Sequence, residues 1–86
     1  MTMTTTQAMM ALTVGVEEEV NTMFGDMIAT GQGIGTSDLG ACFREIHETH
    51  TAVLQHLIVE AVLTLTTIYD MMYAEIDRLE KWYCIA

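Results

Sequence analysis

The residues best suited to chemistry lie in one short segment. All three histidines of the chain fall within it: His47 and His50 are three positions apart, and His56 stands four positions before Glu60. On a helix, both spacings place two side chains on the same face. Imidazole and carboxylate groups held in this way are common ligands of zinc. The segment therefore raises the hypothesis of a metal site.

Carboxylates from another helix would complete such a site. If the chain reverses in the glycine-rich stretch 31–36, the acidic run Glu17–Glu19 faces His47 and His50. Helical bundles build metal sites from carboxylates and histidines on facing helices. A divalent metal is the only cofactor that this hypothesis implies, and no other cofactor is expected. The predicted ligands are His47, His50, His56, Glu60 and Glu19.

The same residues also have a plainer interpretation. None of the three histidines has a glutamate three positions before it, so the pattern typical of di-iron bundles is missing. Ion pairs, buried hydrogen bonds and surface charge account for most groups of this kind. His50 fits a neutral core imidazole that is bonded to Glu19 or Thr49. A buried contact between histidine and glutamate would also make an interface sensitive to pH near neutrality.

No residue set typical of a catalyst accompanies the histidines. The sequence places no base beside Cys42 or Cys84, which a cysteine nucleophile needs. The run Gly31–Gly35 is glycine-rich, but no strand precedes it and no lysine follows it, as a phosphate loop would require. We therefore expect a non-enzymatic protein in which both cysteines are reduced and the glycine run is a connector.

The charge balance restricts the partners. Twelve carboxylates face only three basic residues, Arg44, Arg78 and Lys81, which gives a net charge of −9. Nucleic acids and anionic membranes are bound through clustered Lys and Arg, so we expect neither as a direct partner. A basic protein would be attracted instead. No basic leader is present, and polar residues interrupt the apolar stretch 52–68, so we expect a soluble, cytoplasmic protein.

The pattern of apolar residues predicts one all-α domain over residues 1–86. After a frayed start at 1–6, apolar residues spaced three and four apart predict a first helix over 7–30. A loop at 31–37 carries the dense glycine run. A second helix is predicted over 38–83, because an apolar stripe repeats every eleven residues there and proline is absent. The chain is thus expected to form a hairpin with one short and one long helix.

The long second helix leads to the prediction of an oligomer. Its C-terminal half extends beyond the first helix, and residues 52–68 are apolar on most sides. A helix that is apolar nearly all round must be buried nearly all round. We therefore expect a dimer or higher assembly that forms a helical bundle. The predicted interface consists of Leu54, Leu57, Ala61, Leu65, Ile68, Met72, Tyr73, Ile76, Trp82 and Tyr83.

These features favour a non-enzymatic, oligomeric module for protein–protein interaction. Small acidic proteins of this kind include adaptors, assembly factors and phage-type inhibitors, and this comparison is an analogy of class only. One alternative is a metal-binding bundle built on the three histidines. Another is an acidic mimic of nucleic acid that fills a basic groove on another protein.

Overall fold

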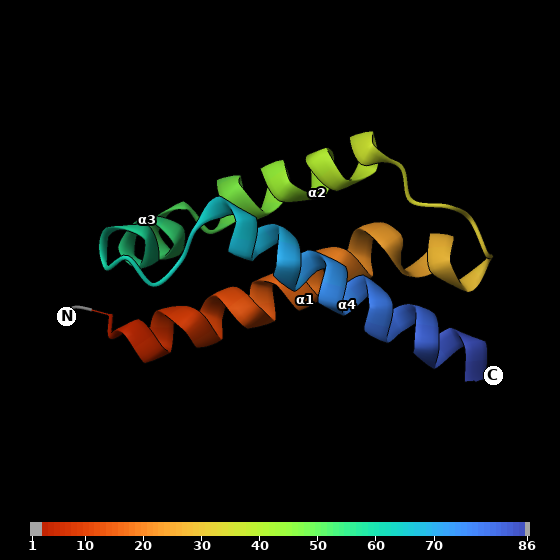
Figure 1. Cartoon of the computed structure of the whole chain (residues 1–86), viewed down its shortest axis with the longest axis horizontal. Coiled ribbons are helices and arrows are strands. Elements are labelled where there is room, and N and C mark those ends of the chain that lie inside the picture. Colours follow the sequence, from red (N-terminus) through yellow and green to blue (C-terminus); the bar gives the residue numbers. More distant parts are fainter. Residues whose placement is uncertain (1–2, 86) are drawn as a thin grey trace.

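The computed structural model describes residues 3–85, and these residues form four α-helices and no strand. The prediction of an all-α protein is therefore confirmed. The helices are joined by short turns and by one loop, and Figure 1 shows their arrangement. Their bounds are α1 Thr5–Ala29, α2 Thr36–Thr49, α3 Thr51–Val59 and α4 Leu65–Ile85.

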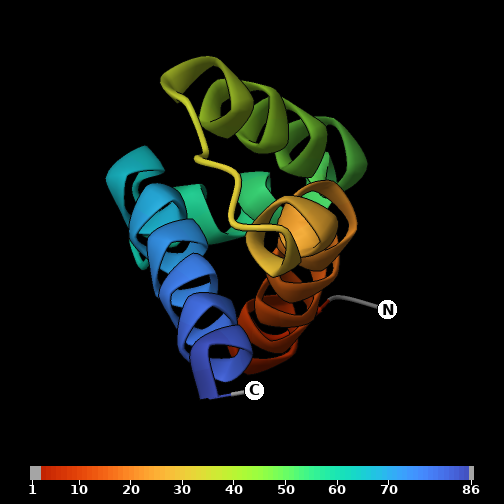
Figure 2. The same cartoon turned by 90° about the vertical axis from the view of Figure 1, so that its right-hand side faces the viewer.

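Helix α1 is the axis on which the other helices pack. Its 25 residues make it about 37 Å long, and it contacts all three other helices. Helix α4 runs in the same direction and crosses α1 near its middle, while α2 and α3 cover another side (Figures 1 and 2). The buried core therefore draws on every helix. Its members are Ala8, Leu12, Val16, Val20, Phe24, Cys42, Ile46, Leu54, Leu57, Leu63, Ile68, Met72, Ile76 and Leu79.

The start of α1 is capped by its own sequence. The backbone N–H of Gln7 donates to Thr4 Oγ1 (3.1 Å), and the backbone N–H of Thr4 donates to Gln7 Oε1 (2.9 Å). This reciprocal capping box satisfies donors that a helix start leaves free. The helix thus begins two residues before the predicted position. Of the predicted frayed segment 1–6, residues 1 and 2 lie outside the described residues, whereas Thr5 and Thr6 are helical.

The glycine-rich loop ends α1 as the sequence indicates. Gly31 has a φ of +75°, a left-handed conformation that glycine adopts without steric cost. Its N–H donates to the Ile28 carbonyl and the Gln32 N–H donates to the Met27 carbonyl, which together form a Schellman motif. Helix α2 then begins at Thr36, where the Gly35 N–H donates to Asp38 Oδ2 (2.9 Å).

The prediction of one continuous helix over 38–83 is wrong, because the segment contains two breaks. The first is at His50, which has φ −117° and ψ 32° and lies between α2 and α3. The second lies between Val59 and Leu65. Neither break contains proline, and only local backbone conformation and capping groups separate the helices.

The second break is a Schellman motif without glycine. Ala61 takes the left-handed conformation, with φ +59°. Its N–H donates to the Ile58 carbonyl, and the Val62 N–H donates to the Leu57 carbonyl. An L-residue in this conformation is strained by about 1–2 kcal/mol. The turn persists because burial elsewhere outweighs that strain.

A pair of threonines starts the fourth helix. The Thr67 N–H donates to Thr64 Oγ1 (3.3 Å), and the Thr64 N–H donates to Thr67 Oγ1 (3.4 Å). The two hydroxyls lie 3.0 Å apart. This is a capping box in which threonine takes the place of the usual glutamate or glutamine. It fixes where α4 leaves the turn.

The turn removes the reason for which an oligomer was predicted. Helix α4 folds back along α1, and Ile68, Met72, Ile76 and Leu79 are buried inside the single chain. Phe43 of α2 also stacks on Tyr69 of α4, with ring centroids 4.7 Å apart. The C-terminal half of the predicted helix is therefore covered by its own chain. Any self-association must rest on other surfaces.

The two Schellman positions make a matched pair for mutation. Ala61→Gly removes the strain of a left-handed alanine and should raise the free energy of unfolding by about 1 kcal/mol. Gly31→Ala introduces the same strain at a site where a new Cβ would meet no atom within 4 Å. This change should lower the free energy of unfolding by a similar amount. Urea unfolding followed by circular dichroism measures both. Equal stability of Ala61→Gly and wild type would contradict the strained turn.

Candidate functional site

The five predicted metal ligands do not come together. His47 is exposed on α2 and Glu60 is exposed at the end of α3, while His50, His56 and Glu19 are half-buried at separate positions. Among residues 3–85, no three His, Cys, Asp or Glu side chains are grouped so that they would hold a metal. The break at His50 is one cause, because it ends the helix on which His47 and His50 were predicted to share one face.

His50 has a structural position against α1. A Cβ added to Gly15 would lie 2.4 Å from His50 Nε2, so the imidazole rests on the α1 backbone where glycine leaves room. Gly15 is buried in the interior of the helix. Gly15 has a low helix propensity, but in this fold its missing side chain admits the histidine at the α2–α3 break.

The two cysteines have opposite environments. Cys42 is fully buried, and Cys84 is exposed near the end of α4. Burial, together with the nearby charges of Glu19 and Glu45, raises the pKa of the Cys42 thiol to about 11. A thiol with so high a pKa is a poor nucleophile near neutral pH. Neither Cys42 nor Cys84 forms a disulfide in the part of the chain that the structure describes.

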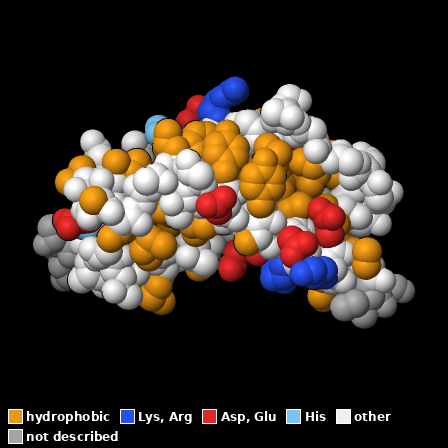
Figure 3. All heavy atoms as spheres, viewed as in Figure 1, with side chains coloured by type: hydrophobic (Ala, Val, Ile, Leu, Met, Phe, Trp, Pro, Cys, Tyr) orange, Lys and Arg blue, Asp and Glu red, His pale blue; other side chains and the backbone are white. Residues whose placement is uncertain are grey.

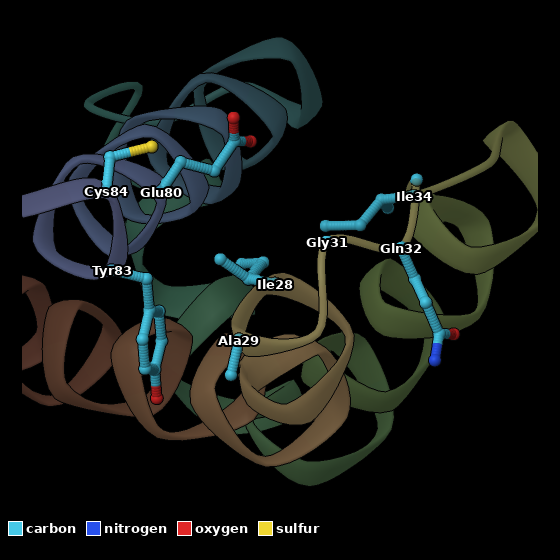
Figure 4. Close-up of a pocket in the computed structure, with 9 residues that line it drawn as sticks. Ile28, Ala29, Gly31, Gln32, Ile34, Glu80, Tyr83 and Cys84 are labelled. Carbon is cyan, nitrogen blue, oxygen red and sulfur yellow. The ribbon is translucent and has the colours of Figure 1, made fainter. Parts of the chain in front are cut away.

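A hollow beside the glycine-rich loop resembles a binding pocket. It has a volume of about 360 Å³ and lies between the loop after α1 and the last turns of α4 (Figure 4). Ile28 and Ile34 line one wall, and Glu80, Tyr83 and Cys84 line the other. The carboxylate of Glu80 is unfavourable for a phosphate. The loop therefore retains its interpretation as a connector.

Half of the predicted interface serves the chain's own core. Leu54, Leu57, Ile68, Met72 and Ile76 are buried within the single chain. The remaining residues are at the surface: Ala61, Leu65, Tyr73 and Trp82 are exposed, and Tyr83 is half-buried. Because Tyr73 and Trp82 are nine positions apart on α4, they face opposite sides of that helix.

A first apolar surface surrounds the turn between α3 and α4. We call it the corner patch, and it consists of Ile58, Val59, Val62 and Leu65, which are 44%, 76%, 49% and 51% exposed. Ile58 and Val59 also line a shallow hollow of about 270 Å³. The turn stands at one end of the molecule (Figure 1). Val59 and Val62 lie off the apolar stripe that predicts the buried face, whereas Leu65 lies on it.

A second apolar surface lies between α1 and α4. We call it the α1–α4 groove. One hollow of about 450 Å³ lies between the two helices, and another of about 480 Å³ continues along α1. Met9, Thr13 and Glu17 line both, so the two hollows form one surface. Met10 and Val14 stand exposed beside it. Hydrophobic side chains are visible in Figure 3 where α1 begins.

One end of the groove is closed by a polar cluster that ties α1 to α4. Glu75 is almost fully buried; Asn21 Nδ2 donates to its Oε1 (3.1 Å) and Arg78 Nε donates to its Oε2 (3.0 Å). The Arg78 hydrogen bonds lower the pKa of Glu75, against the opposing effect of burial, and Asn21 lowers it further. The pKa of Arg78 is raised mainly by Glu75 and slightly by the nearby Glu17.

Sequence reasoning missed the groove. Met10 and Val14 lie four positions apart, off the stripe that predicts the buried face of the first helix. That spacing is a signal for a second apolar face. The matching wall on α4 has no local signal, because its place against α1 depends on the turn at Ala61.

Comparisons with protein-family models, with curated proteins and with solved structures find no match. Within residues 3–85, no helix combines the length and the apolar character needed to cross a lipid bilayer.

The contact between His50 and Gly15 is testable with a double-mutant cycle. In the wild-type background, Gly15→Ala should lower the free energy of unfolding by about 1–3 kcal/mol, because the new methyl group meets the imidazole. In a His50→Ala background, the same change should raise it by up to about 1 kcal/mol through helix propensity. Chemical denaturation of the four proteins gives the coupling. The same effect of Gly15→Ala in both backgrounds would show that the two residues are independent.

The buried carboxylate predicts a dependence of stability on pH. Glu75 has a lower pKa in the folded protein than in the unfolded chain, so its contribution is present above the unfolded value near 4.5 and is lost as pH falls through the folded value. Glu75→Gln should cost about 1–2 kcal/mol at pH 7 and much less at acid pH. Urea midpoints across this pH range should converge for the two proteins. A constant difference would contradict the prediction.

Proposed function

We propose that the protein is a non-enzymatic helical interaction module that pairs with a second copy of itself through the corner patch. The observation that carries this proposal is the exposure of Val59, which is 76% accessible, together with its three large apolar neighbours around one turn. Apolar side chains grouped at the surface favour a contact with another macromolecule. The adaptor, assembly-factor and inhibitor classes all act through such contacts.

The distribution of charge supports a second copy as the occupant of this patch. Residues 50–69 contain only one Asp, Glu, Lys or Arg residue, Glu60, although the whole chain has a net charge of −9. Two like-charged molecules approach with least repulsion where their local charge is lowest. A two-fold axis at the patch would place the same apolar side chains against one another. A contact built on four side chains favours a weak, reversible dimer.

The proposal predicts an unusual response to salt. The two copies repel each other at long range, so screening should strengthen the dimer as ionic strength rises from about 0.01 M to about 0.1 M. Sedimentation equilibrium over a range of protein concentrations measures this effect. A protein that stays monomeric at every concentration and ionic strength would refute the pairing.

A matched pair of surface variants locates the contact. Val59→Ser with Val62→Ser should weaken the dimer roughly tenfold or more, since each lost side chain contributes on the order of 1 kcal/mol. Val14→Ser, an exposed valine on α1, is the control and should leave the dimer unchanged. If Val14→Ser alone dissociates the dimer, the contact lies in the α1–α4 groove and the assignment to the corner patch is wrong.

A further inference from the structure

The α1–α4 groove is a second surface that self-pairing at the corner patch does not use. The geometry points to a basic amphipathic helix of a partner protein as its occupant. This inference rests on the proposed function, because it names the class of partner that the interaction module would bind. It is carried by the shape of the groove, by its side chains and by its charge.

The shape and the side chains of the groove fit a helix. Helices α1 and α4 cross (Figure 1), and the two hollows beside them are open rather than closed cavities. The walls carry Met9 and Met10 from α1 and Met71 and Ala74 from α4. Methionine side chains are unbranched and adaptable, so they suit the apolar face of an incoming helix. Small Ala74 leaves space for that face.

The polar atoms of the groove are largely satisfied within the chain. The Thr13 hydroxyl donates to the Met9 carbonyl (2.8 Å), so it needs no hydrogen-bond acceptor from a ligand. Glu75 and Arg78 neutralise each other in the ion pair that closes one end. An apolar occupant would therefore leave few polar groups without hydrogen bonds. This favours a helix face over a polar small molecule.

The charge of the groove decides between a basic partner and a second copy. Once Glu75 and Arg78 are paired, the excess charge at this end is the exposed carboxylate of Glu17, and Glu18 follows it on α1. A second copy would bring the same carboxylates and its own net charge of −9 towards them. Lysine or arginine beside the apolar face of a partner helix would instead be attracted, both at long range and at contact.

A synthetic peptide tests this inference directly. The probe is a fluorescent Leu–Lys peptide whose leucines recur at helical spacing on one face, and it is titrated into the full-length protein while anisotropy is measured. Its controls are a Leu–Glu peptide with the same pattern and a scrambled Leu–Lys peptide with the same composition. We expect saturable one-to-one binding of the first peptide, at least tenfold weaker binding of the scrambled peptide, and none of the Leu–Glu peptide. Binding should weaken as salt is added.

Surface variants then place the peptide in the groove. Met10→Ser with Val14→Ser should weaken binding tenfold or more, and Glu17→Gln should weaken it less and reduce its dependence on salt. The corner variant, Val59→Ser with Val62→Ser, should bind the peptide as wild type does. Circular dichroism confirms that each variant is folded, which is expected because the substituted residues are exposed.

Several results would overturn the inference. Equal binding of the patterned and scrambled peptides would reduce the effect to non-specific charge attraction. Loss of peptide binding in the corner variant would move the site away from the groove. Binding to phosphatidylcholine vesicles in place of the peptide, abolished by Met10→Ser with Val14→Ser, would assign the groove to a lipid surface. A dimer without peptide binding would refute this inference alone, whereas peptide binding by a strict monomer would refute only self-pairing.

Discussion

The fold depends on burying one long apolar stripe within a single short chain. The stripe runs from Ile46 to Tyr83, and a straight helix would carry its second half out of reach of α1. The turn at Ala61 solves this problem, because it returns α4 to the side of α1. Strain of about 1–2 kcal/mol in one left-handed alanine is small beside the gain from burying Ile68, Met72 and Ile76, at about 1.5–3 kcal/mol for each side chain.

The sequence predicted what is buried better than it predicted the path of the chain. The stripe has eleven positions, of which His50 and Tyr83 are half-buried and only Ala61 and Leu65, at the turn, are exposed. The other seven are buried: Ile46, Leu54, Leu57, Ile68, Met72, Ile76 and Leu79. Periodicity therefore identified the core while it concealed the break. Helix ends are recognised from proline, glycine or a capping side chain, and the turn at Ala61 has only the weak threonine signal at Thr64 and Thr67. Its stability comes from contacts between residues far apart in the sequence.

The candidate surfaces could be predicted only in part, because they too depend on the turn at Ala61. Val59, Val62 and Leu65 are apolar in the sequence, but their exposure follows from a turn that the sequence did not reveal. The α1–α4 groove needs both walls, and only the wall on α1 has a local pattern, in Met10 and Val14. The metal hypothesis relied on two helical spacings, His47–His50 and His56–Glu60, and each of them ends where a helix ends. His50 lies at the break between α2 and α3, and Glu60 is the C-cap of α3.

Two irregular positions, Gly15 in α1 and His50 between α2 and α3, depend on each other. Taken alone, Gly15 lowers the propensity of α1 by about 1 kcal/mol, and His50 interrupts a helix without an evident cause. In the folded chain the imidazole lies where Gly15 lacks a side chain, so each position accounts for the other. Such agreement between local exceptions and the global fold is expected of a sequence with one preferred structure. The two breaks also explain where the corner patch lies. The break at His50 directs α3 across α1, and the turn at Ala61 then leaves Val59 and Val62 at the outer end of the molecule, away from the core.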